Sequence, residues 1–253
     1  MTLCRKQTLC ALLLLNLGVL PASWAGCDDP AAPGVNWSGC DKSGAALSGA
    51  DLRGAILKRT IMNEVDLSGA RLSGADFSFA KLRGARLNRT RMDEVSMLGA
   101  DLSGAELNGA LLDRSKLDRV DLQQAQLQGA SLVESNLYQA RLDNANLAGA
   151  RLIRAELKQA VFDGADLSGA DLEQANLLQA SLEHTNLRDS SLIKANLEKA
   201  NLYYADLRGA DLYRASLVNA ELYETRFEGS RLGGALWVDR TRCPLDAGDI
   251  CKE

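Results

Sequence analysis

From Ala45 to Trp237 the sequence repeats every five residues without an insertion or a deletion. One column of the repeat, position 45 and every fifth residue to 235, is alanine at 28 of 39 positions and otherwise threonine, serine or valine. The column two residues later is leucine at 32 of 38 positions and otherwise methionine or phenylalanine. A helix has about 3.6 residues per turn and a strand alternates every two, so neither keeps both columns on one face. The period predicts a backbone that turns once per five residues and buries two of them.

Glycine and proline are placed as such a coil requires. Glycine often precedes the small residue, as at Gly49, Gly69 and Gly169, and we expect it to mark corners where space is tight. Proline is absent between positions 34 and 243. Because proline cannot donate a backbone hydrogen bond, its absence indicates that the bonds between successive coils are needed throughout.

Individual repeats resemble a known consensus. The pentapeptides 50–54 (ADLRG), 165–169 (ADLSG) and 195–199 (ANLEK) are similar to the A(D/N)LXX motif of the pentapeptide-repeat family. The resemblance covers about three quarters of the chain and implies an all-β fold, the right-handed quadrilateral β-helix. In that fold four pentapeptides form one coil and the leucines stack along the axis. The repeats of this chain then predict about ten coils.

The first 25 residues differ from the rest in the manner of a secretory signal peptide. Arg5 and Lys6 precede an apolar run over 9–20, and small residues lead to a predicted cleavage site near Ala25. The run is shorter than the roughly 20 residues needed to span a bilayer, although an uncleaved membrane anchor is the alternative. We therefore expect a periplasmic or secreted protein whose mature chain has no transmembrane segment.

Cleavage would leave four cysteines, in two local pairs at opposite ends of the chain. An even number of cysteines in an oxidising compartment indicates two short disulfide loops, one from Cys27 and Cys40 and one from Cys243 and Cys251. Their spacing fits no zinc signature, so we expect no metal there. Lipidation of Cys27 is an alternative, but Trp24 stands where lipoboxes usually carry leucine and Cys40 would lose its partner.

The same features divide the chain into four segments. A solenoid exposes apolar residues and unpaired edges at its ends, so it needs caps to prevent end-to-end association. The segments are a signal peptide over 1–25, an N-terminal cap with a disulfide loop over 26–44, the pentapeptide-repeat β-helix over 45–237, and a C-terminal disulfide cap over 238–253.

The outward positions contain no recognisable catalytic, cofactor or metal site. His184 is the only histidine, and without a second one no familiar acid–base arrangement can be built, so we interpret it as a solvated side chain. Asparagine and aspartate stack in columns such as Asn146, Asp166, Asn186 and Asp206, where they suit the turns. We therefore expect no enzyme activity and no cofactor.

Exposed apolar and aromatic residues gather in the second half of the repeat, where residues twenty apart are expected to lie above one another. Strips of this kind more often mark contacts than accidents. They predict a surface for self-association or for a protein partner, with scattered surface packing as the alternative. The candidate residues are Val133, Tyr138, Ile153, Leu178, Ile193, Tyr203, Tyr204, Tyr213, Val218 and Tyr223.

These observations favour an exported structural and interaction module that meets an unknown protein or envelope partner, or forms a homo-oligomer. The alternative is a DNA mimic acting on DNA gyrase in the manner of the Qnr quinolone-resistance proteins, which belong to the same family. Arginines such as Arg71, Arg91 and Arg151 interrupt the outward columns, and the predicted export separates the chain from gyrase. A net charge of −4 is also too small to indicate nucleic-acid binding.

Overall fold

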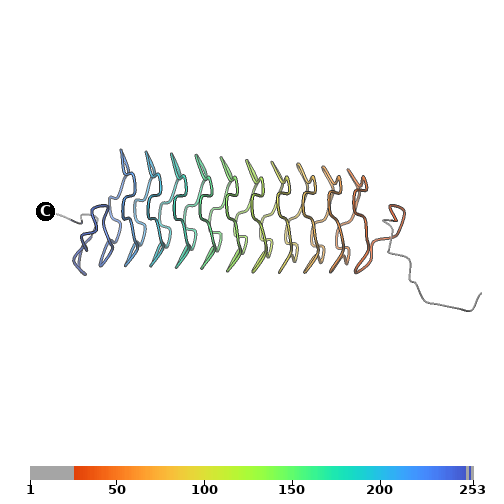
Figure 1. Cartoon of the computed structure of the whole chain (residues 1–253), viewed down its shortest axis with the longest axis horizontal. Helices are drawn as coiled ribbons and strands as arrows, with labels where there is room; N and C mark the ends of the chain where they lie inside the picture. Colours follow the sequence, from red (N-terminus) through yellow and green to blue (C-terminus); the bar gives the residue numbers. More distant parts are fainter. Residues whose placement is uncertain (1–25, 249–250, 252–253) are drawn as a thin grey trace, which may run out of the picture.

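The protein is a straight rod of stacked coils, seen in a computed structural model that describes residues 26–248 and Cys251 (Figure 1). The predicted signal peptide over 1–25 lies outside the described residues. Single parallel bridges join each coil to the next, from Asn36↔Ile56 to Ser216↔Leu236, always between residues twenty apart. One coil therefore takes four pentapeptides, as the resemblance implies. The first bridge lies within the segment expected to form the N-terminal cap.

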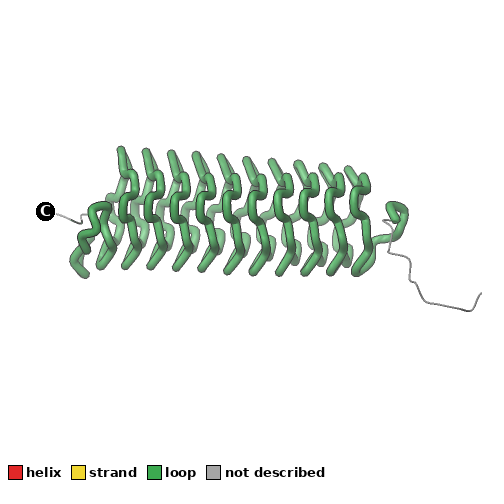
Figure 2. Tube along the Cα trace, viewed as in Figure 1, coloured by secondary structure: helices red, strands yellow, loops and turns green. Residues whose placement is uncertain are grey.

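The tube view shows only loops and turns, because each side of a coil is too short to be a strand (Figure 2). The backbone is nevertheless densely paired. In pentapeptides away from the ends, three amides bond to neighbouring coils, as from Leu152 N to Asp171 O at 2.6 Å, from Arg154 N to Glu173 O at 2.9 Å and from Arg151 N to Ala130 O at 2.9 Å. A fourth amide closes the corner. The bonds between coils carry the order that a regular strand would otherwise provide.

The corners explain the glycine column, and the reason differs from the one expected. Every fifth residue from Gly34 to Gly234 has a φ between 54° and 73°, and 18 of these residues are glycine. A φ of this sign at the third residue, with a bond such as Ala155 N to Leu152 O at 3.0 Å, defines a type II turn. A Cβ atom on Gly49, Gly69 or Gly169 would meet nothing within 4 Å. The expectation of tight space was wrong, and glycine is favoured by the left-handed backbone.

Where aspartate or asparagine precedes the leucine, it can pair the fifth amide. Its side-chain oxygen accepts a hydrogen bond from the residue two positions later, as from Ser168 N to Asp166 Oδ1 at 2.9 Å. Elsewhere a side chain of the preceding coil takes this role, as where Val133 N donates to Asp113 Oδ1 at 3.0 Å. The aspartate or asparagine of the A(D/N)LXX consensus thus pairs the one amide that the backbone hydrogen bonds leave unpaired.

Both predicted inward columns are buried along the rod. Leucines from Leu52 to Leu217 stack with almost no exposure, and the small residues fill the space beside them. The void among the central leucines is about 10 Å³, less than a water molecule needs. At most positions where serine or threonine replaces alanine, the hydroxyl donates to a main-chain carbonyl, as from Thr90 Oγ1 to Leu87 O at 2.7 Å, whereas the buried hydroxyl of Ser230 has no partner among the described residues. The core is therefore filled, and all but one of the hydroxyl groups in its small-residue column are paired.

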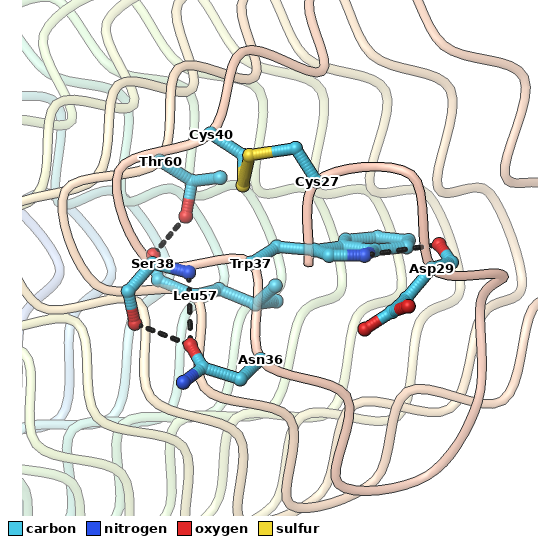
Figure 3. The surroundings of a disulfide bond; sticks show 8 residues. All are labelled: Cys27, Asp29, Asn36, Trp37, Ser38, Cys40, Leu57 and Thr60. Atoms are coloured by element: carbon cyan, nitrogen blue, oxygen red, sulfur yellow. Dashed lines mark hydrogen bonds between the residues drawn. A yellow bond between two sulfur atoms is a disulfide. The ribbon is translucent and has the colours of Figure 1, made fainter. Parts of the chain in front are cut away.

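A tryptophan closes the N-terminal end (Figure 3). Trp37 occupies a position of the leucine column, is 1% exposed, and donates from Nε1 to the carbonyl of Asp29 at 3.1 Å. The predicted disulfide joins Cys27 to Cys40 with their Cα atoms 5.5 Å apart, which holds the entering chain against this ring. The ammonium of Lys42 lies 4.3 Å from the centre of the ring. Cys27 is therefore a disulfide partner in this structure.

The C-terminal end is closed by backbone pairing. The chain reverses after Trp237, and Leu236 forms an antiparallel bridge with Arg242. Four amide bonds fix the returning segment to the last coil, including Cys243 N to Ala235 O at 2.9 Å. The second predicted disulfide, between Cys243 and Cys251, fastens this segment with a Cα–Cα distance of 4.9 Å.

Candidate interaction surface

The twenty-residue coil decides which of the predicted surface residues meet. Five residues correspond to a quarter turn and ten to half a turn, so Tyr213 lies on the opposite side of the rod from Tyr203 and Tyr223. Val133, Ile153 and Ile193 share the column of Tyr213. The candidate residues therefore do not form one patch. They divide among three corners of the rod.

The intermediate corner carries the column of Tyr138, Leu178 and Val218. Tyr138 and Leu178 are half-buried and Val218 is buried. On the far corner, Tyr213 lies beneath two arginines, with the guanidinium carbons of Arg214 and Arg231 at 5.0 and 4.4 Å from its ring centre. These residues offer less apolar surface than their sequence positions suggested.

One corner near the C-terminal end concentrates exposed rings, and we define it as the aromatic corner: His184, Tyr203, Tyr204 and Tyr223. The His184 and Tyr204 rings are parallel to within 6° with centres 4.8 Å apart. Tyr223 contacts Tyr204 and Tyr203 edge-on at 5.5 and 5.8 Å. Tyr204 is 44% exposed and Tyr223 is 58% exposed. The four rings form a continuous aromatic surface over three successive coils.

The aromatic corner is electrically negative. The charge of Glu221 first, then partial burial, a hydrogen bond to Glu221 and the charge of Glu183 raise the pKa of the Tyr203 hydroxyl above its ordinary value. Glu183 Oε1 also lies 3.8 Å from His184 Nε2. These carboxylates disfavour a second negative charge and favour a positive one.

The part that His184 takes in this corner was missed by sequence reasoning. The side chain is 63% exposed, as expected of an outward position, but it stacks on a tyrosine. The available signal was the spacing, because Tyr204 follows His184 by twenty residues and both occupy the left-handed corner position. Residues at that position project away from the rod and can stack in adjacent coils.

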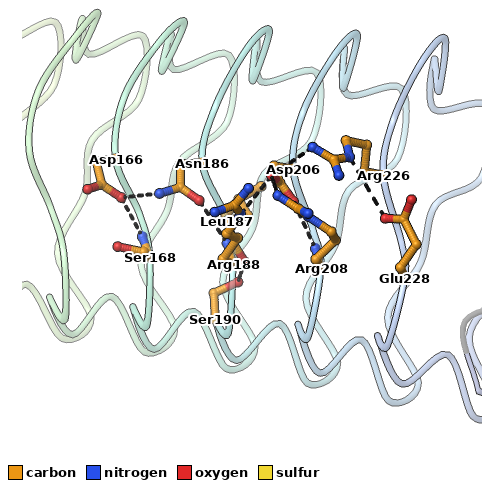
Figure 4. A network of polar contacts seen from close by, with 10 residues as sticks. All are labelled: Asp166, Ser168, Asn186, Leu187, Arg188, Ser190, Asp206, Arg208, Arg226 and Glu228. Carbon is orange, nitrogen blue, oxygen red and sulfur yellow. Dashed lines mark hydrogen bonds and ion pairs between the residues drawn. The ribbon is translucent and has the colours of Figure 1, made fainter.

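The column of asparagine and aspartate on the adjoining side is occupied by the protein's own donors (Figure 4). Asn186 Nδ2 donates to Asp166 Oδ1 at 2.9 Å. Arg188 Nε and Arg208 Nη2 each lie 2.7 Å from Asp206 Oδ2, and Arg226 Nη1 lies 3.7 Å from it. The carboxylates are thus paired with donors of the same column, so this side of the rod is electrically neutral.

A second exposed ring lies toward the N-terminal end. Phe79 is 51% exposed at a left-handed corner, and its ring lies where a side chain on Gly99 would stand, with two ring atoms 3.0 Å from the Cβ position. The hollow beside it is lined by Ser38, Lys58, Arg59 and Leu98 and is open to solvent. It does not enclose a ligand.

Comparison with known proteins identifies the solenoid. A family model described as pentapeptide repeats, in 8 copies, matches overlapping segments between residues 33 and 234. The chain belongs to the pentapeptide-repeat family. Membership gives the solenoid its type, a right-handed β-helix. A comparison with curated proteins returned no match.

Two solved structures illustrate the likeness of this pentapeptide-repeat protein. HetL, a pentapeptide-repeat protein involved in heterocyst differentiation regulation from the cyanobacterium Nostoc sp. strain PCC 7120, is 32% identical with a TM-score of 0.51. That match covers 83% of this chain and 92% of HetL. A trypsin-treated variant of QnrB1, a plasmid-mediated fluoroquinolone resistance protein, is 20% identical with a TM-score of 0.50, over 74% of this chain and 89% of QnrB1. The QnrB1 likeness shows the fold alone.

Among residues 26–248 and Cys251, no three histidine, cysteine or acidic side chains come together to hold a metal ion. Across these same ranges, no helix is both long and apolar enough to cross a bilayer.

Proposed function

We propose that this pentapeptide-repeat protein is an exported, non-catalytic module, a rigid rod of about ten coils that offers its surface to a protein or cell-envelope partner. Disulfides persist in oxidising compartments, so the pairs Cys27–Cys40 and Cys243–Cys251 support export. The signal-peptide sequence before Gly26 supports the same location. Residence would be periplasmic or secreted.

The single observation that carries the interaction role is the aromatic corner. The core is filled along the rod, so recognition has to use the outer surface. Tyrosines are enriched in protein interfaces because they combine a large apolar ring with a polar hydroxyl. Tyr204 and Tyr223 place two such rings side by side in solvent.

Ion pairing favours this module over a DNA mimic. A mimic of DNA needs continuous negative columns, but here arginines are paired with aspartates one coil away. Arg141 Nη1 lies 3.3 Å from Asp121 Oδ2, and Arg231 Nη1 lies 2.8 Å from Asp211 Oδ2. Such pairs neutralise the columns that a DNA-binding enzyme would recognise.

The experiment combines one mass measurement with one binding measurement. The intact mass of the protein from its own cells, with and without reduction and alkylation, should show a chain beginning at Gly26 with no free thiols. Tyr204→Asp with Tyr223→Asp should abolish binding of the specific partner or formation of the homo-oligomer. The same changes at Tyr138 and Tyr213 should leave both intact. A full-length chain with free thiols would refute export. Binding of the same partner by both double variants would show that the aromatic corner is not the interaction surface.

The column of Ile153 and Ile193 on the opposite side stays a separate prediction of a contact surface. Ile153→Asp with Ile193→Asp should alter the oligomeric state or the set of partners if this column is used. An unchanged sedimentation profile together with unchanged partners would eliminate it.

A further inference from the structure

The carboxylates around the aromatic corner are three glutamates, Glu183, Glu221 and Glu224. Glu183 precedes His184, and Glu224 continues the corner column one coil beyond Tyr204. Glu221 lies one coil beyond Asn201 and influences Tyr203. The glutamates thus flank the rings on the same side of the rod.

In the part of the chain that the structure describes, these three glutamates are not neutralised by lysine or arginine, unlike the carboxylates of several arginine-paired residues elsewhere on the rod. On the opposite side of the rod, for example, Arg114 Nη2 lies 3.1 Å from Glu94 and Arg154 Nη1 lies 3.0 Å from Glu134. Within the described ranges, no lysine or arginine forms an ion pair with any of the three glutamates. Only His184 comes within ion-pair distance of one, Glu183. Negative charge is therefore left available beside exposed rings.

We propose that the aromatic corner binds an arginine side chain presented by an extended basic segment of a protein partner. The inference rests on the proposed function and names the chemistry of its partner. A guanidinium is planar and weakly hydrated, so it stacks on an aromatic ring while its N–H groups reach carboxylates. Tyr204 and Tyr223 supply exposed rings, and Glu183 and Glu221 supply acceptors on the same corner.

The length of the corner suits more than one contact. His184, Tyr204 and Glu224 follow one another at twenty-residue intervals in one column, and Tyr203 and Tyr223 stand in the column beside it. Adjacent coils lie about 4.8 Å apart, whereas alternate side chains of an extended peptide are about 7 Å apart. A segment with arginine at alternate positions therefore places successive guanidinium groups over different rings of the corner.

The test is direct binding of a defined peptide to the mature chain by isothermal titration calorimetry. The probe is an alternating glycine–arginine hexapeptide, and its glycine–glutamate counterpart is the charge control. Measurements at about 0.15 M salt screen long-range attraction to the acidic rod. We expect the arginine peptide to bind and the glutamate peptide not to bind.

Two sets of variants locate the binding. Tyr204→Ala with Tyr223→Ala should weaken it by about tenfold or more, while Tyr204→Phe with Tyr223→Phe should retain it within about twofold. Replacing Glu183, Glu221 and Glu224 by glutamine should also weaken it by about tenfold. The matched control replaces Glu94, Glu134 and Glu173 on the opposite side by glutamine, which changes net charge equally and should leave affinity unchanged.

Equal weakening by both glutamine sets would show binding to net charge and overturn the proposal. Absence of binding, or binding that survives loss of both tyrosine rings, would overturn it as well. The proposed function is separable from this result, because a specific partner lost with Tyr204→Asp and Tyr223→Asp supports it even when the arginine peptide does not bind. A specific partner that carries a basic segment and competes with the peptide would support both.

Discussion

The two ends of the rod are closed by different physical means. At the N-terminal end a side chain fills the core, with Trp37 buried over the first leucines and a disulfide holding the chain beside it. At the C-terminal end the backbone itself turns back and pairs with the last coil, and Trp237 remains half-buried against Phe227 with ring centres 5.5 Å apart. Closure of the N-terminal end depends on the volume of the Trp37 side chain. Closure of the C-terminal end depends on a close approach of two backbone segments.

This difference shows that the same residue types, a tryptophan and a cysteine pair, can have different structural roles at the two ends. Each end has one tryptophan and one cysteine pair, yet only Trp37 is enclosed. Stability in a solenoid is approximately a sum of local terms between neighbouring coils. A destabilising substitution at either end should therefore have little effect on distant coils, and the two ends should respond to different substitutions.

The largest effect is expected from removal of the N-terminal plug. Trp37→Ala should lower the free energy of unfolding of the first coils by about 3–5 kcal/mol, because it leaves a cavity where a large side chain was enclosed. Trp237→Ala is the matched control and should cost clearly less, since that ring is half-buried. Urea unfolding with amide exchange over 35–60 measures the difference. Equal losses at both ends would show that the comparison is mistaken.

The two disulfides should contribute almost equally. The Cys27–Cys40 loop has a sequence separation of 13 and the Cys243–Cys251 loop one of 8. Loop-closure entropy then gives about 3 kcal/mol for the first and slightly less for the second. Replacing either pair by serine should increase amide exchange at that end while coils near residue 130 keep their protection. Equal exchange in oxidised and reduced protein at both ends would contradict this expectation.

Close backbone approach can be tested at the C-terminal end. A Cβ atom on Gly233 would lie 2.4 Å from the carbonyl oxygen of Leu245, so Gly233→Ala should displace the returning segment. We expect a loss of about 1–3 kcal/mol, typical of overpacking, together with faster amide exchange over 241–248. Gly248→Ala is the control, because its Cβ atom would meet nothing within 4 Å. Unchanged exchange in Gly233→Ala would argue against tight pairing.

Acid should give the smallest effect and loosen the N-terminal third. Hydrogen bonds from the Ser43 amide and hydroxyl lower the pKa of Asp41, and those from the Ser68 hydroxyl and amide lower the pKa of Asp66. A carboxyl whose pKa is lowered by folding stabilises the fold above its unfolded pKa, and this contribution is lost as pH falls through the folded pKa. The others with lowered pKa in this region are Asp51, Asp76 and Asp101.

The measurement is amide exchange at pH values on both sides of 3.8, the ordinary pKa of an aspartate side chain, corrected for the intrinsic exchange rate. Protection over 40–100 should fall below that pH. Asp41→Asn with Asp66→Asn should reduce this pH dependence, because the amide oxygen still accepts the bonds but does not titrate. A fall in protection that is equal in both proteins would refute the assignment.

The solenoid could be predicted from the sequence because its periodicity is local and unbroken. The small and leucine columns were predicted to be buried, and the structure confirms both. The cysteine pairs were also predicted correctly, since each pair is close in sequence and has no competing partner. The role of glycine was wrong in its reason, because sequence shows a missing side chain but not the sign of φ.

The candidate surface was only partly predictable. The spacing of Tyr203 and Tyr223 correctly placed them one coil apart, but Tyr213 was grouped with them although ten residues is half a turn. The stacking of His184 on Tyr204 and the burial of Val218 depend on how corner side chains lean between coils. Assigning a residue to a column gives the position of its backbone on the rod but not the direction in which its side chain points.

The sequence by itself determined the repeat, the core and the two disulfide pairs, because each rests on a short-range rule applied along the whole chain. Only the tertiary structure decided how the ends close and which outward residues meet. Those outcomes depend on contacts of the end segments with the coils, such as Trp37 with Asp29 and Gly233 with Leu245, and on contacts between coils, whose geometry no local rule specifies. The aromatic corner arises in the same way, from four rings brought together by a coil of twenty residues.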